Sequence, residues 1–149
     1  MLVLNRRVGE TIHIGDDVCV TVYDKLRYHV TMGVIAPTNA QVFYGEMRMR
    51  PAILPDGERF YLISLLTTEM FRIDDIELRV SFTPSYLGAG STRKRQVQLA
   101  IAAPKSVPVQ REEIYLQHLD RDGKRRPAMS FATLLRQANL AVSSGRVAA

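Results

Sequence analysis

One stretch of this sequence occurs twice, and that repetition restricts the possible folds more than any other feature. Residues 69–80 match residues 10–22 position by position once a single glycine is skipped. Residues 103–105 (Ala-Pro-Lys) then match residues 36–38 (Ala-Pro-Thr), at a larger offset because the loop at 83–95 is longer in the second copy. Internal repetition indicates a repeated supersecondary unit. We therefore expect two similar small units within one chain.

The units read as strands joined by tight turns. Val18, Val20 and Val22 alternate with polar or smaller residues, which is typical of a strand with one buried face. Turn residues such as Val8-Gly9 separate the runs, and Pro37 interrupts pairing because proline has no N–H to donate. The strands predicted on these signals are residues 2–7, 11–14, 18–23, 28–35 and 40–44, then 60–66, 96–102 and 108–110. Residues 69–80 are expected to repeat the strand–turn–strand pattern of residues 10–22, with Asp74-Asp75 at the turn.

Proline, glycine and charge divide the chain into four segments. Pro51 and Pro55-Asp56-Gly57 are typical of a connection. The predicted division is a first repeat at 1–48, a linker at 49–59, a second repeat at 60–119 and a basic C-terminal extension at 120–149.

Two helices are predicted near the C-terminus. The first covers residues 111–119 and is ended by Gly123 and Pro127. The second covers residues 130–142, where apolar residues fall near one face. We expect the second helix to dock against the body or a partner.

The positive charge is concentrated at one end. Residues 120–149 hold six Lys or Arg against two Asp, so this segment carries +4 of the formal net charge of +5. Any nucleic-acid site in the rest of the chain must therefore rely on a few placed arginines. The basic segment itself fits either a sequence-independent attraction to phosphates or a solvated, solubilising tail.

Several classes of protein are disfavoured by composition. Cys19 is the only cysteine and is expected to be a small buried hydrophobe, so no disulfide is expected. The three histidines are scattered and are expected on the surfaces of strands and helix, so no metal set is expected. No apolar run reaches membrane-spanning length, and no signal-peptide pattern occurs at the N-terminus, so we expect a cytoplasmic protein without a membrane partner. No nucleophile–base pairing, phosphate-binding glycine loop or carboxylate cluster indicates an enzyme or a cofactor.

Two long motifs resemble the carbon storage regulator (CsrA/RsmA) family. Residues 1–18, Met-Leu-Val-Leu-Asn-Arg-Arg-Val-Gly-Glu-Thr-Ile-His-Ile-Gly-Asp-Asp-Val, are similar to its start, and residues 102–115 are similar to its last strand and helix. With the repeats between them, the resemblance covers roughly residues 1–119. It implies a mainly β fold in which two five-stranded repeats form an intrachain strand-exchanged pseudo-dimer, followed by short C-terminal helices.

The resemblance also implies a function and a set of site residues. The family binds GGA motifs in hairpin loops of messenger RNA leaders or small regulatory RNAs, at sites that combine the first strand of one unit with the last strand of the other. The corresponding positions of this chain are Leu4, Arg6, Arg7, Ala103, Pro104, Lys105, Val107, Val109 and Arg111. The other pair of half-sites is altered and consists of Ile63, Leu65, Leu66 and Tyr44.

The retained residues are complementary, because strand exchange would bring them to the same site. We therefore expect one intact RNA site per chain and one degenerate, largely apolar site. An alternative is a degenerate family member that binds no RNA and acts as a protein partner or antagonist through Leu65, Leu66, Tyr44 and the C-terminal helix. Association of two chains, or pairing with an ordinary family member, is also open.

Overall fold

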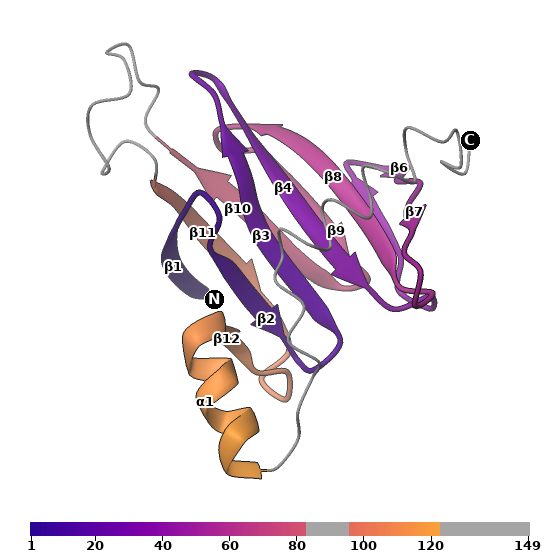
Figure 1. Ribbon diagram of the computed structural model, residues 1–149. Coiled ribbons are helices and arrows are strands. Elements are labelled where there is room, and N and C mark those ends of the chain that lie inside the picture. Colours follow the sequence, from indigo (N-terminus) through magenta and orange to yellow (C-terminus); the bar gives the residue numbers. More distant parts are fainter. Residues whose placement is uncertain (83–95, 123–149) are drawn as a thin grey trace.

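The structure is a computed structural model that describes residues 1–82 and 96–122, with side chains as far as residue 117 (Figure 1). The described residues form two six-stranded antiparallel sheets and one helix, α1 (Glu112–Asp122). The predicted mainly β fold is confirmed. The predicted helix at 130–142 and most of the basic extension lie outside the described residues.

The first sheet has the strand order β1-β11-β10-β9-β5-β6. Its strands are β1 (Leu2–Arg7), β11 (Gln96–Ala102), β10 (Ile76–Ser81), β9 (Met70–Ile73), β5 (Val42–Tyr44) and β6 (Met47–Arg48). The second sheet has the order β12-β2-β3-β4-β8-β7. Its strands are β12 (Val109–Arg111), β2 (Thr11–Ile14), β3 (Val18–Lys25), β4 (His29–Ala36), β8 (Arg59–Leu66) and β7 (Ala52–Ile53).

Both sheets contain strands from both halves of the chain. The N-terminal strand β1 pairs with β11, and Leu4 lies opposite Leu99. In the second sheet β8 pairs with β4, and Ile63 lies opposite Met32. The short strands are exchanged as well, since β12 pairs with β2 and β5 pairs with β9. The predicted exchange of strands within a single chain is therefore confirmed.

The main core lies between the two sheets. Alternating residues of each strand point into it, as the valines at 18, 20 and 22 of β3 do from one side and Leu78 and Leu99 do from the other. A smaller cluster on the opposite face of the second sheet joins Cys19 to Phe60 and to residues 52 and 54. The predicted linker at 49–59 thus contributes β7 and buried side chains, and Cys19 is a buried thiol as expected.

The chain leaves β5 and β12 in different ways. After β5, Gly45 adopts φ 60°, a left-handed conformation that favours glycine, and the chain reverses into β6. After β12 the chain enters α1, whose first turn holds Glu112 and Glu113 at the end where acidic side chains are favourable. This difference gives the two ends of the structure different surfaces.

Candidate nucleic-acid interface

The strands that carry the predicted site meet through β2. A tight turn leads from β1 to β2, in which the Glu10 carboxylate accepts a hydrogen bond from the Arg7 N–H at 2.7 Å. On its other side β2 pairs with β12, and Arg111 lies opposite Ile12. The predicted first-strand and last-strand residues lie close together, because Arg6 of β1 is hydrogen-bonded to Glu113, two residues after the end of β12.

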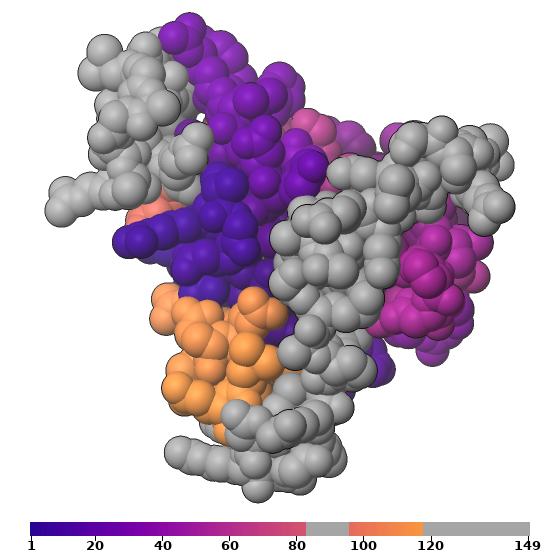
Figure 2. Space-filling model, in the orientation of Figure 1, coloured from indigo at the N-terminus to yellow at the C-terminus, as the bar shows by residue number. Residues whose placement is uncertain are grey.

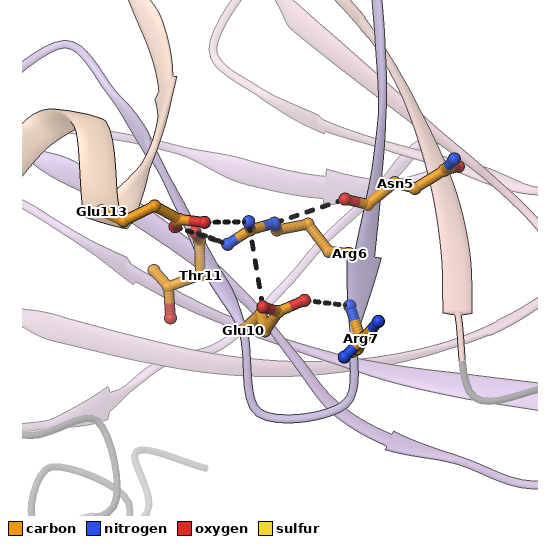
Figure 3. Close-up of polar contacts among 6 residues, drawn as sticks. All are labelled: Asn5, Arg6, Arg7, Glu10, Thr11 and Glu113. Carbon is orange, nitrogen blue, oxygen red and sulfur yellow. Dashed lines mark hydrogen bonds and ion pairs between the residues drawn. The ribbon is translucent and has the colours of Figure 1, made fainter. Parts of the chain in front are cut away.

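A buried guanidinium connects these elements (Figure 3). Arg6 is 5% exposed, and its two terminal nitrogens donate to the Glu113 carboxylate at 3.0 and 2.7 Å. The same side chain donates to the Thr11 carbonyl at 3.1 Å and lies 3.9 Å from Glu10. The Arg6 hydrogen bond lowers the pKa of Glu113, and Arg111 adds a weaker effect in the same direction. Arg6 therefore holds β1, β2 and α1 together.

The predicted residues differ in their exposure. Leu4 and Arg6 are buried, and the half-buried Val107 and Val109 pack against the core. Four of the predicted residues are exposed: Arg7, Pro104, Lys105 and Arg111. In Figure 2 the N-terminal strands and α1 adjoin on one face, in agreement with the contacts between α1 and β2.

A second set of contacts fixes α1, and sequence reasoning missed it. His13 is 5% exposed and its ring stacks on Tyr115, with centroids 3.9 Å apart and 11° between the planes. The expectation that the histidines lie on the surface is therefore wrong for His13, because α1 covers it. Its Nε2 lies 3.3 Å from Glu112 Oε1, and its Nδ1 lies 3.4 Å from Cys19 Sγ.

These contacts change the protonation of His13. Burial lowers its pKa, but the hydrogen bonds to Cys19 and Glu112 outweigh that effect and raise the pKa to about 9. The sequence signal for the contacts of α1 was the adjacent pair Glu112 and Glu113. Two carboxylates directly after a strand can each bind a cation on a neighbouring strand.

The altered half-sites have a different interior. Ile63 and Leu65 are buried, whereas Leu66 is 44% exposed. The Tyr44 hydroxyl donates to Glu69, and that hydrogen bond is the main cause of the lowered pKa of Glu69. Glu69 also accepts from the Leu66 N–H at 2.6 Å, as Glu10 does from Arg7. The turn is retained, but Leu65 replaces the buried arginine.

Within the ranges that the structure describes, no group of three or more His, Cys, Asp or Glu residues could hold a metal ion. In the same ranges, no helix combines the length and apolarity needed to cross a bilayer.

The described chain is thus a β-sheet module whose exchanged strands bring basic residues to two sheet edges. Residues 1–50 match the family described as CsrA, Global regulator protein family. The chain is 43% identical over 47 residues to a translational regulator CsrA of Desulforamulus reducens, across 32% of this chain and 59% of that protein. It is 44% identical over 50 residues to a translational regulator CsrA of Hydrogenovibrio crunogenus, across 34% of this chain and 71% of that protein.

No solved structure is significantly similar to the chain. The chain belongs to the CsrA family, whose members are regulators and not enzymes. It spans 59% of the length of the first of these relatives, and the match lies in the N-terminal third of the present chain.

Proposed function

We propose that this chain is an RNA-binding post-transcriptional regulator that recognises GGA motifs in hairpin loops of messenger RNA leaders or small RNAs through one composite site. The observation that carries the proposal is the bidentate pair between Arg6 and Glu113, which joins β1 to α1. It supports a site shared by the two ends of the chain. The cytoplasm, typical of the family, is the proposed location.

The residues have separate roles in this proposal. Single-stranded loops present unstacked bases, which edge-strand backbone groups and arginines can contact. Arg111 and Arg7 are exposed and supply charge-assisted hydrogen bonds to a base or phosphate, and Lys105 adds a phosphate contact. The half-buried side chains of the 103–109 segment shape the apolar floor on which a base packs. Arg6 is the positioning residue, because its guanidinium is already bound by Glu113.

The second pair of half-sites lacks the groups that this chemistry requires. Leu66 and Tyr44 stand where Arg7 and Arg111 stand in the proposed site, and the Tyr44 hydroxyl is bound to Glu69. We therefore propose one GGA hairpin per chain.

Titration of a labelled GGA hairpin, with fluorescence anisotropy as the readout, tests the proposal. Arg111→Ala should weaken binding about 5- to 150-fold, the range that corresponds to ~1–3 kcal/mol for a good arginine–base contact. Tyr44→Ala, at the matching position of the altered half-site, should leave the affinity unchanged. Light scattering of the complex should give one hairpin per chain. Equal binding of a hairpin whose loop lacks GGA would contradict the proposal.

The alternative is a protein partner or antagonist that does not bind RNA. Leu62 and Leu66 favour it, because both are more than a third exposed on the same face of β8. The same titration separates the two functions. Absence of hairpin binding, together with a stable complex between this chain and an ordinary family member, would support the alternative.

A further inference from the structure

Three residues on adjacent strands form a second candidate surface, far along the first sheet from β1. Phe43 of β5 lies directly opposite Arg48 of β6 on one side and opposite Arg72 of β9 on the other. Residues opposite one another on antiparallel strands share a face, with Cβ atoms roughly 5 Å apart. The guanidinium carbon of Arg72 lies 4.6 Å from the centre of the Phe43 ring. An aromatic ring thus stands between two arginines in one row.

This row lies on the outer face of the sheet. Val42 of β5 and Ile73 of β9 point into the core. Phe43 and Arg72 are the adjacent residues on these strands, so their side chains point to the outer face. Arg48 and Arg72 are exposed and Phe43 is half-buried. The row is therefore accessible to a ligand.

The corresponding place at the other end of the structure is covered. Val109 lies opposite Ile14, as Val42 lies opposite Ile73. The next pair at this end, Gln110 and His13, therefore corresponds to Phe43 and Arg72. His13 is buried beneath Tyr115 of α1. At Gly45 the chain turns into β6 instead of entering a helix, which leaves this face open and adds Arg48 to it.

No ion pair with a described residue neutralises the charge of Arg48 or Arg72. The ion pairs among the described residues involve Arg6 and His13, and neither Arg48 nor Arg72 takes part in them. Arg79, on the same sheet, differs because it donates to the Thr68 carbonyl at 3.1 Å. Glu77 lies opposite Arg72 on β10 and marks the end of the positive row.

We propose that Phe43, Arg48 and Arg72 form a second RNA-contacting surface, which binds the unpaired nucleotides that flank a bound hairpin. The inference rests on the proposed function. Bases stack on aromatic rings and on guanidinium planes whatever their sequence, and arginines beside them bind the phosphates. A base stacks on the outer plane of Arg72, above Phe43, and Arg48 binds an adjacent phosphate. The surface takes single strands without sequence preference.

The test compares a short GGA hairpin with the same hairpin carrying about ten unpaired nucleotides, in the full-length protein. The flank should tighten binding by the wild-type chain about tenfold, the effect of one or two added base stacks. Phe43→Ala and Arg72→Ala should each remove most of that gain and leave the affinity for the short hairpin unchanged. Arg111→Ala should lower the affinity for both RNAs and leave the gain from the unpaired flank unchanged. Failure of the proposed function and failure of this inference therefore give different results.

Arg79→Ala is the matched control, because it removes the same charge from the same sheet at a residue bound to backbone. If it reduces the gain as much as Arg72→Ala does, general electrostatic attraction accounts for the gain and the proposal is wrong. No gain from the flank in the wild type also overturns it. Phe43→Leu keeps the apolar contact and removes the aromatic face, so it replaces Phe43→Ala if that variant unfolds on thermal denaturation. Arg48→Ala, which removes the proposed phosphate contact, should reduce the slope of log affinity against log salt by about 0.7 for the flanked RNA.

Discussion

Arg6 and Leu65 occupy corresponding positions at opposite ends of the structure. Arg6 lies opposite Val97 on β11, and Leu65 lies opposite Val30 on β4. Both side chains are buried, at 5% and 0% exposure, yet only one is charged. A buried guanidinium is stable only when it is paired, and the carboxylate of Glu113 supplies that pairing.

Removal of that carboxylate should therefore destabilise the fold. Glu113→Ala leaves Arg6 with the Thr11 carbonyl and a distant Glu10, and we expect a loss of about 2 kcal/mol in the free energy of unfolding, measured by urea denaturation. Glu77→Ala, an exposed glutamate in a strand, should change stability by less than about 0.5 kcal/mol. Arg6→Leu combined with Glu113→Ala should recover part of the loss, since no unpaired charge remains. A double variant less stable than Glu113→Ala would contradict this account.

The two leucines of the altered half-site should respond differently to truncation. Leu65→Ala opens a cavity in the main core and should cost about 2–5 kcal/mol. Leu66→Ala removes a side chain that is 44% exposed and should cost less than about 1 kcal/mol. Thermal denaturation of both variants gives the comparison, and similar losses would show that the burial assigned to Leu65 is incorrect.

Stability should depend on pH through His13. Its pKa is raised from 6.5 to about 9, so the folded state binds the proton more tightly than the unfolded chain. The contribution is complete below pH 6.5 and is lost as the pH rises through about 9, with a total on the order of 3 kcal/mol. Urea denaturation between pH 6 and 10 should show this decline in the wild type. His13→Gln should remove the decline, whereas His29→Gln, which changes an exposed histidine, should keep it.

The turn after β5 should be sensitive to the residue at position 45. Gly45 has φ 60° and open space around the position of a Cβ, so the cost of a side chain is one of backbone conformation. Gly45→Ala should destabilise the protein by about 1–2 kcal/mol, and Gly45→Asn should cost less because asparagine adopts this conformation more readily. The free energy of unfolding of the two variants checks the order, and an equal loss for both would argue against the left-handed turn.

Local patterns were enough to predict most of the strands. The alternating valines of β3 and the run at 96–102 gave elements close to those observed, because each strand buries one regular face. β3 continues past its predicted end to Lys25 through an irregularity between Val22 and Asp24, which alternation does not encode. β6 and β7 are only two residues long, and their pairing depends on neighbours that a local pattern does not identify.

The candidate site was predictable in its residues but not in their roles. Arg6 and Arg7 are adjacent in sequence and similar in chemistry, and only the fold shows that Arg6 faces inward to Glu113. The separation of those partners along the chain explains the difficulty, since nothing local connects residue 6 with residue 113. The burial of His13 was missed for the same reason, because α1 covers it from the far end of the sequence.

The exchange of strands also constrains the order of events during synthesis. β1 leaves the ribosome well before its partner β11, and β2 must likewise wait for β12. Such distant pairings slow folding, and open strand edges favour association with other chains. The N-terminal half therefore spends most of translation with unpaired edges, at risk of pairing with a neighbouring nascent chain, and the fold closes only once the second half has emerged.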